Sequence, residues 1–235
     1  RMIVYADGRT LGSVGGGAVE GDVIERALGM IGTSEPELVS FDLENDTGMI
    51  CGGGMRIFLE PLSGGPLALI IGGGHVGKAV ARVAKDAGFR VEVVDDRKDI
   101  VSRERFPFAD RRLVGGVELL DEQIRTTDAT YIVVVTRGHS FDAEWVHALA
   151  GRTFAYLGMI GSREKVQRTF EKLADSGADP SFLKKIHAPI GLDLGADTPE
   201  EIAVSVVAEM IAVRHGITDT AMLREKAADK GRNRE

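Results

Sequence analysis

From residue 66 onward the sequence alternates short apolar runs with segments in which apolar residues recur at helical spacing. Continuous apolar runs of about five residues are typical of parallel strands covered on both faces. Strands are predicted at Leu67–Ile71, Arg90–Val94, Arg111–Val114, Tyr131–Val135 and Phe154–Leu157. Because helices are predicted between and after these strands, we expect an α/β fold in which a Rossmann-like parallel sheet occupies residues 66–235.

The first 64 residues follow a different pattern, with short strands and one predicted helix. Asp7–Gly8 indicates a hairpin turn, because such a turn needs positive φ. A helix is predicted over Ala18–Ile31, with an apolar face that reaches from Val19 to Ile31. Further strands are predicted at Val39–Leu43 and Arg56–Leu59, and Pro61–Pro66 resembles a linker. We therefore predict a small α+β domain over residues 1–64.

Three glycines follow the strand Leu67–Ile71 in the spacing G-x-G-x-x-G, namely Gly72, Gly74 and Gly77. In a dinucleotide-binding unit the first allows a tight turn, the second lets a pyrophosphate approach, and the third lets the helix pack on the strand. Free N–H groups at the helix N-terminus bind phosphate oxygens. Asp95 lies about 20 residues on, where an acid accepts hydrogen bonds from a ribose. The alternative is that these glycines serve only helix–strand packing.

Two more loops follow predicted strands, Thr136–Ser140 and Gly158–Ser162. Ligands bind at the carboxyl ends of strands in open α/β sheets, so we expect these loops and the glycine loop to share one crevice. The candidate binding residues in the three loops and just after them are His75, His139, Gly161, Ser162 and Arg163.

Each of these candidates also has a purely structural interpretation. His75 and Arg163 are then solvated side chains. His139, which could bind a ligand or pair with Asp142, then only makes a hydrogen bond at a helix entry. Ser162 is a natural N-cap for the helix that follows.

Cys51 is the only cysteine, and Gly48 and Gly52–Gly54 flank it. An accessible thiol on a glycine loop is suited to bind a soft metal or sulfur, so Cys51 is the candidate metal ligand. The alternative is a small apolar residue in a core. A single cysteine forms no intrachain disulfide, which fits a reducing cytoplasm.

Charge and hydropathy disfavour two classes of partner, nucleic acids and membranes. The net charge of −7 disfavours nonspecific binding to nucleic acid. No apolar run approaches the ~20 residues of a membrane span. We therefore expect a cytoplasmic protein with neither nucleic-acid nor membrane partners.

Five motifs together resemble the XdhC/CoxI family of xanthine dehydrogenase accessory proteins. They are Gly15-Gly-Gly-Ala-Val-Glu20, Cys51-Gly-Gly, Gly72-Gly-Gly-His-Val-Gly77, Gly158-Met-Ile-Gly-Ser-Arg163 with Lys165, and Ala188-Pro-Ile-Gly-Leu-Asp-Leu-Gly195 followed by Thr198–Ser205. The last two are the most specific, because no general Rossmann rule requires them.

The resemblance implies a two-domain maturation factor rather than an enzyme that turns over a substrate. Such a factor binds the molybdenum cofactor (molybdopterin) and holds it while a cysteine desulfurase helps to place its sulfido ligand. It then delivers the cofactor to an apo xanthine dehydrogenase or a related molybdenum hydroxylase. We also expect a homodimer.

By the same resemblance, Cys51 and Glu20 belong to motifs of the small domain, and His75 belongs to the Rossmann motif. Glu20 also has an electrostatic interpretation, because a carboxylate in the first turn of a helix is favoured by the dipole. Family members carry a further N-terminal segment before the part that matches Met2–Gly17. We therefore expect either a trimmed chain or a shorter relative.

Two alternative functions stay open. An NAD(P)-dependent oxidoreductase is supported by the glycine fingerprint and Asp95, and would use NAD(P) as its cofactor. A nucleotide-sensing Rossmann module would bind a nucleotide without catalysis and would have no use for Cys51. The sequence shows neither a Tyr-x-x-x-Lys pair nor a G-x-S-x-G elbow, and nothing in it positions a hydride acceptor.

Overall fold

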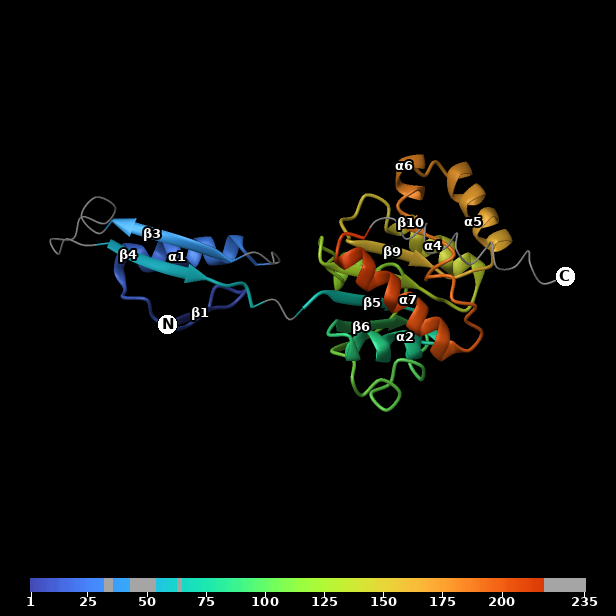
Figure 1. Cartoon of the computed structure of the whole chain (residues 1–235), viewed down its shortest axis with the longest axis horizontal. Helices are drawn as coiled ribbons and strands as arrows, with labels where there is room; N and C mark the ends of the chain where they lie inside the picture. The colour runs from blue at the N-terminus through green and yellow to red at the C-terminus, as the bar shows by residue number, and fades with distance from the viewer. Residues whose placement is uncertain (32–35, 43–53, 63–64, 218–235) are drawn as a thin grey trace. The chain divides into compact units, whose positions relative to one another are not determined.

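The computed structural model describes residues 1–31, 36–42, 54–62 and 65–217. The chain forms two compact units, Arg1–Gly64 (unit 1) and Gly65–Glu235 (unit 2), each with its own strands and core (Figure 1). Cys51, its neighbours Gly48, Gly52 and Gly53, and the predicted strand end at Leu43 lie outside the described residues, whereas Gly54 is described.

Unit 1 contains two antiparallel strand pairs and one helix. β1 (Met2–Val4) pairs with β2 (Thr10–Gly12), and β3 (Glu37–Asp42) pairs with β4 (Gly54–Leu59). The predicted hairpin turn contains Gly8, whose φ of +83° is one that glycine adopts without steric cost. The helix α1 spans Gly17–Gly29.

The core of unit 1 is small and involves only part of α1. Val19 and Val23 are buried together with Val39 and Phe41 of β3. The predicted apolar face was too long, because Leu28 and Ile31 are 37% and 48% exposed. The helix ends at Gly29, and its buried residues all lie in its first two turns, so this part alone faces the core.

Unit 2 is built on one parallel sheet of six strands. The strand order is β10-β9-β8-β5-β6-β7, and every neighbouring pair is parallel. The strands are β5 (Leu67–Ile71), β6 (Arg90–Asp95), β7 (Arg111–Val114), β8 (Thr130–Val134), β9 (Tyr156–Met159) and β10 (Ile186–His187). The strand order reverses between β5 and β8, which makes their carboxyl ends the topological switch point.

Helices cover both faces of this sheet (Figure 1). Alternate residues of β5 serve opposite faces, so Ala68 and Ile70 pack with α2 (His75–Asp86) and α7 (Pro199–Arg214). Leu69 and Ile71 belong to the other core. That second core also contains residues of α3 (Leu119–Glu122), α4 (His139–Ala148), α5 (Arg163–Asp175) and α6 (Pro180–Leu183).

The predicted α/β fold with a Rossmann-like sheet is confirmed, and the differences concern short elements. β9 begins at Tyr156 and continues through Gly158, whereas the prediction ended it at Leu157. Residues Tyr156–Met159 all pair with β8, so the strand continues past Gly158, although glycine disfavours strands and weakens the sequence pattern there. β10 and α6 were not predicted, because elements of two and four residues show no periodicity.

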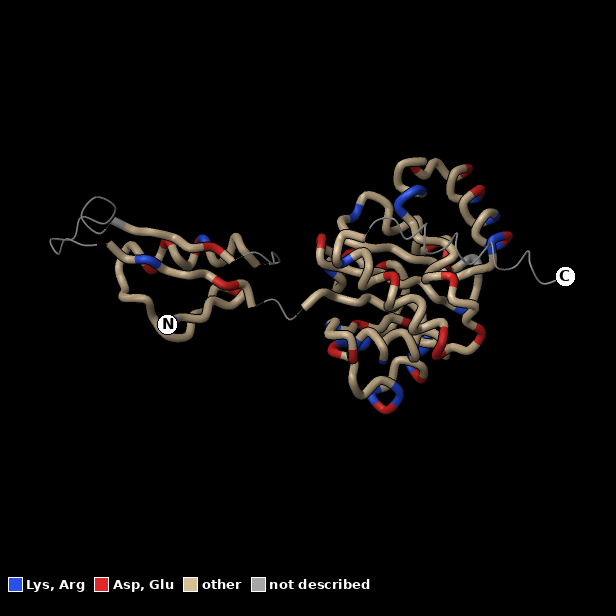
Figure 2. The backbone as a smooth tube through the Cα atoms, in the orientation of Figure 1, with Lys and Arg blue, Asp and Glu red and all other residues tan. Residues whose placement is uncertain are grey.

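Charged residues of both signs are interspersed along the described chain (Figure 2). The predicted absence of a nucleic-acid partner stays a prediction. Among the helices that the structure describes, none combines the length and apolar character that a membrane-spanning helix needs.

Candidate functional site

The glycine loop lies at the switch point, between the ends of β5 and β8. Gly72 has a φ of +112°, and a Cβ atom placed on it would lie 2.3 Å from the carbonyl oxygen of Val135. A Cβ atom on Gly77 would lie 1.8 Å from the carbonyl oxygen of Gly72. Close backbone packing therefore requires glycine at both positions, with or without a ligand.

Gly74 differs from these two glycines because a Cβ atom there would meet nothing within 4 Å. Gly74 is the N-cap of α2, and its φ is −64°. No side chain accepts a hydrogen bond at this helix start, and the first turn contains no acidic residue. The other described helices each have an acidic first turn or a capping side chain. The N-terminus of α2 is thus open and electropositive, as a phosphate site requires. His75 is exposed in this first turn.

Asp95 ends β6 and is buried beside the glycine loop. Its carboxylate accepts hydrogen bonds from Gly73 N (2.8 Å) and from the backbone N, Nε and Nη2 of Arg97 (3.1, 2.8 and 2.9 Å). Burial raises the pKa of Asp95, but the hydrogen bonds from Arg97 and Gly73 outweigh this, and the pKa lies below its ordinary value. These four donors match the four lone-pair sites of a carboxylate, so a ribose hydroxyl would have to displace Arg97.

The loop after β8 is tied to α5 through Asp142, which is completely buried. Its Oδ1 accepts hydrogen bonds from Thr136 Oγ1 (2.6 Å) and Thr136 N (3.1 Å), and its Oδ2 lies 3.2 Å from Lys165 Nζ. Among the side chains that the structure describes, Thr136 and Lys165 are the partners of the Asp142 carboxylate. The backbone of His139 begins α4, but its side chain lies outside what the structure describes.

The loop after β9 leads into α5 through Gly161 and Ser162. Ser162 is the N-cap, because its Oγ accepts a hydrogen bond from Lys165 N (3.2 Å). The alkyl chain of Lys165 covers Gly161, where a Cβ atom would lie 2.9 Å from its Cδ. Ser162 and Gly161 thus help to build the loop, which leaves their binding role a prediction.

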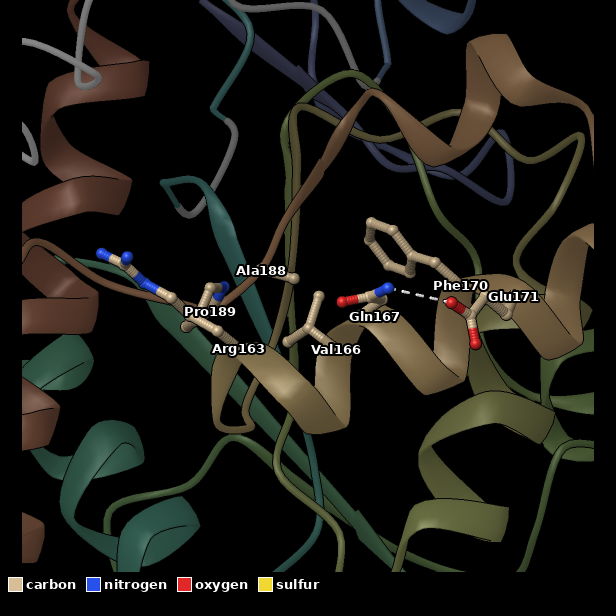
Figure 3. A pocket seen from close by; sticks show the side chains of 7 residues that line it. All are labelled: Arg163, Val166, Gln167, Phe170, Glu171, Ala188 and Pro189. Atoms are coloured by element: carbon tan, nitrogen blue, oxygen red, sulfur yellow. Dashed lines mark hydrogen bonds between the residues drawn. The ribbon is translucent and has the colours of Figure 1, made fainter.

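Arg163, at the start of α5, lines a shallow groove of about 500 Å³. Figure 3 shows the groove between one side of α5 and the segment that follows β10. Val166, Phe170, Ala188 and Pro189 give it an apolar floor, and the hydrogen-bonded pair Gln167–Glu171 (3.0 Å) lies at one end. A smaller cavity of about 120 Å³ lies at the carboxyl ends of β5, β6 and β8, where Gly72, Asp95 and Thr136 are among its lining residues. The structure therefore places Arg163 in a groove along α5 and not among the residues that line this smaller cavity.

A buried carboxylate that the sequence analysis missed fixes the segment after β10. Glu209 of α7 accepts hydrogen bonds from Tyr156 Oη (2.6 Å) and Gly191 N (2.8 Å), and its Oε1 lies 3.1 Å from His187 Nδ1. Burial raises the pKa of Glu209, but the hydrogen bonds from His187, Tyr156 and Gly191 lower it to about 2.

The same contacts explain the family motif around Gly191. Its φ is +93°, and a Cβ atom would lie 2.4 Å from Ser205 Oγ. Ser205 Oγ in turn donates a hydrogen bond to the carbonyl oxygen of Leu192. The loop that contains Gly191 lies directly against Ser205 of α7. A side chain at position 191 would therefore collide with Ser205, whose hydroxyl group in turn holds the loop. No local sequence pattern indicated that Tyr156, His187 and Gly191 would contact Glu209, because these residues lie 18 to 53 positions away from it.

In unit 1, Glu20 folds back over the turn before α1. Its Oε2 accepts hydrogen bonds from Ser13 Oγ (2.5 Å), Gly16 N (3.1 Å) and Val14 N (3.3 Å). The hydrogen bond from Ser13 lowers the pKa of Glu20, and the two backbone donors add to this. Glu20 therefore organises the glycine-rich turn, and a role in cofactor binding stays a prediction. In the part of the chain that the structure describes, no three His, Cys, Asp or Glu side chains could together hold a metal ion.

Comparison with known proteins identifies relatives of both units. A profile of the XdhC Rossmann domain matches residues 68–210, and a profile of the XdhC and CoxI family matches residues 1–42. The uncharacterized protein YqeB of Escherichia coli (strain K12) is 33% identical over 233 residues, which are 95% of this chain and 42% of that protein. A probable xanthine dehydrogenase subunit of Bacillus subtilis (strain 168) is 31% identical over 159 residues, which are 68% of this chain and 46% of that protein.

The chain thus spans less than half the length of these two curated relatives. A crystal structure of a xanthine dehydrogenase from Bacillus halodurans has the same fold, with a TM-score of 0.59 at 19% identity. That similarity covers 93% of this chain and 87% of the other. Because the profile of the Rossmann domain alone matches more than half of the 235 residues, this chain belongs to the XdhC family.

Proposed function

We propose that this protein is a maturation factor that binds the molybdenum cofactor, supports its sulfuration and delivers it to a xanthine dehydrogenase-type molybdenum hydroxylase. The observation that carries the proposal is membership of the XdhC family, with matches in both units. The name of the Bacillus subtilis relative links that protein to xanthine dehydrogenase. An apo molybdenum hydroxylase and a cysteine desulfurase are the partners that this role requires, and we expect the factor to act as a cytoplasmic homodimer.

The open N-terminus of α2 fits the phosphate group of the cofactor's pterin. Backbone N–H groups of the first turn would bind its oxygens, and the bare Gly74 would let them approach. Gly73 donates to Asp95, which holds the loop in place. When bound, the cofactor supplies the molybdenum centre that the client enzyme needs. Molybdenum favours soft ligands, which makes the Cys51 thiolate the proposed metal ligand.

The first experiment measures molybdenum and pterin in protein that is co-expressed with an active cofactor pathway. Gly74→Val places a branched side chain where the phosphate would lie, and its Cβ atom meets no protein atom within 4 Å. Gly21→Val is the matched control, because Gly21 also has open space around it. We expect Gly74→Val to bind the cofactor about tenfold more weakly and so to retain less of it, and Gly21→Val to retain as much as the wild type, since a good charge-assisted contact is equivalent to about a tenfold change in affinity.

Cys51→Ala tests the metal ligand in the same assay. We expect the variant to lose molybdenum while unit 2 stays folded, as reported by the fluorescence of Trp145, the only tryptophan of the chain. Unchanged molybdenum in Cys51→Ala would remove the thiolate from the proposal. Wild-type protein without molybdenum or pterin would contradict the carrier role and favour a nucleotide-sensing module, whereas hydride exchange with NAD(P) would favour an oxidoreductase.

A further inference from the structure

The helix α7 has a solvent-facing side that is apolar along its middle. In Figure 1, α7 lies across the sheet on the side turned to the viewer. Val204 is 52% exposed, and Ala208 and Ile211 on the same side of the helix are partly buried. These positions are four and three residues apart, so they form one stripe, which we call the α7 stripe. The outward side of α2, by contrast, carries Lys78 and Arg82. Apolar residues on both sides of a helix are typical of one that is covered on both sides.

Two further exposed apolar side chains flank the ends of α7. Leu194, shortly before the helix, is 59% exposed, and Ile217, just after it, is 52% exposed. With Val204 they are three of the five exposed large apolar side chains in the described part of unit 2. The loop of Leu194 is held beside α7, because Leu192 N donates a hydrogen bond to the carbonyl oxygen of Ser205 (3.3 Å). Such a concentration of exposed apolar groups marks an interaction surface.

Charged side chains lie only at the two ends of the α7 stripe, and the two ends differ in sign. Glu200 and Glu201 are exposed in the first turn of the helix. Arg214 and His215 are exposed at its last turn. Glu200 lies four residues before Val204, and His215 lies four residues after Ile211, so both continue the stripe on its own side of the helix. The stripe is thus acidic at one end, apolar in the middle and basic at the other end.

This arrangement is complementary to a second copy of itself in the antiparallel direction. When two α7 helices cross just before Ala208, Val204 lies opposite Ile211 of the partner subunit, and Glu200 lies opposite His215 of the partner subunit. A parallel arrangement would instead place the acidic ends of both helices together, which is unfavourable. A two-fold axis produces the antiparallel arrangement, and the small Ala208 beside this axis lets the helices approach to about 8–10 Å.

We propose that two copies of this protein pair through their α7 helices, antiparallel and around a two-fold axis near Ala208. This inference rests on the homodimer expected under the proposed function and assigns its surface, but it requires neither molybdenum nor the glycine loop. The 16 residues of α7 form a strip about 24 Å long and about 10 Å wide, to which Leu194 and Ile217 add. Such a strip is smaller than the ~800 Å² per partner of a standard interface, so we expect a weak dimer with a dissociation constant on the order of 10 μM.

The test is sedimentation equilibrium of the full chain at concentrations from about 1 to about 300 μM, which span the expected dissociation constant. Val204→Glu places a charge in the middle of the α7 stripe. Val114→Glu is the matched control, because Val114 is also exposed (47%) but lies on β7. We expect wild type and Val114→Glu to dimerise equally, and Val204→Glu to dimerise at least about tenfold more weakly. A wild-type protein that stays monomeric at the highest concentration, or a dimer that Val204→Glu does not weaken, would overturn the proposal.

A charge exchange tests the antiparallel direction. His215→Glu places a carboxylate opposite Glu200 of the partner subunit, and we expect it to weaken the dimer about fivefold. Adding Glu200→Arg should restore the wild-type affinity. Adding Glu164→Arg instead should not, because Glu164 is also an exposed acid in a first turn, but of α5. No recovery with Glu200→Arg, or equal recovery with Glu164→Arg, would contradict the antiparallel pairing.

Two measurements on the same samples separate this proposal from the carrier role. The fluorescence of Trp145 reports whether unit 2 is folded in each variant, and molybdenum and pterin are measured as described above. A wild-type monomer that retains the cofactor would refute only the pairing through α7. A wild-type dimer that Val204→Glu dissociates, but that binds no cofactor, would refute only the carrier role.

Discussion

Replacing Glu209 by glutamine removes one negative charge from the buried contact that holds the segment after β10 against α7. Glutamine has the same shape, so its amide oxygen can still accept the hydrogen bonds from Tyr156 and Gly191. Its amide nitrogen can donate to His187 in the neutral tautomer. The substitution therefore tests the charge of Glu209 while it keeps the packing.

The size of the expected effect follows from the pKa of Glu209, which burial raises but the hydrogen bonds from His187, Tyr156 and Gly191 lower from 4.5 to about 2. Such a change is equivalent to about 3 kcal/mol in the free energy of unfolding. Because the pKa is lower in the folded protein, this contribution is complete above pH 4.5. It is lost as the pH falls from 4.5 towards 2.

The assay is urea denaturation followed by the fluorescence of Trp145, which reports on unit 2 because it is the only tryptophan. We expect Glu209→Gln to be about 3 kcal/mol less stable than wild type at pH 7, with the difference shrinking below pH 4.5. Glu200→Gln, an exposed position on the same helix, should cost less than about 1 kcal/mol at every pH. A difference between wild type and Glu209→Gln that stays constant from pH 7 to pH 3 would refute the reasoning.

Two further pairs of substitutions test the packing of the glycine loop and the buried ion pair of Asp142. Gly77→Ala should lower the free energy of unfolding by about 3 kcal/mol, because its Cβ atom would lie 1.8 Å from the carbonyl oxygen of Gly72. Gly74→Ala, which meets no neighbour, should change the melting temperature little, and equal melting temperatures for the two variants would contradict the packing argument. Lys165→Met should also cost about 3 kcal/mol, because it leaves the buried Asp142 without its cation. Adding Asp142→Asn should recover part of that loss in urea denaturation, and no recovery would show that the charge of Asp142 is not the cause.

Local signals in the sequence were enough to define most elements of unit 2. The runs at Leu67–Ile71 and Arg111–Val114 coincide with β5 and β7. Thr198 and Glu201 form the capping box that starts α7, and Pro199 is its first residue. These signals act within a few residues, so they do not depend on how the chain folds back on itself.

The candidate site was predicted less completely, because the partners of its residues come from distant segments. The fingerprint located the glycine loop, but it could not show that Gly72 and Gly77 are required by packing while Gly74 faces open space. Likewise, the position of Asp95 at the end of β6 was predictable, whereas the four hydrogen bonds that its carboxylate accepts were not.

The sequence by itself thus determined the order of the longer strands and helices of unit 2, the place of the glycine loop and the motifs of the XdhC family. Only the tertiary structure decided which polar groups are buried together, as for Glu209 with Tyr156, 53 residues away, and for Asp142 with Lys165. The physical reason is that periodicity and capping arise from neighbouring residues. The environment of a buried charge, in contrast, is created only when separate elements pack and exclude water around it.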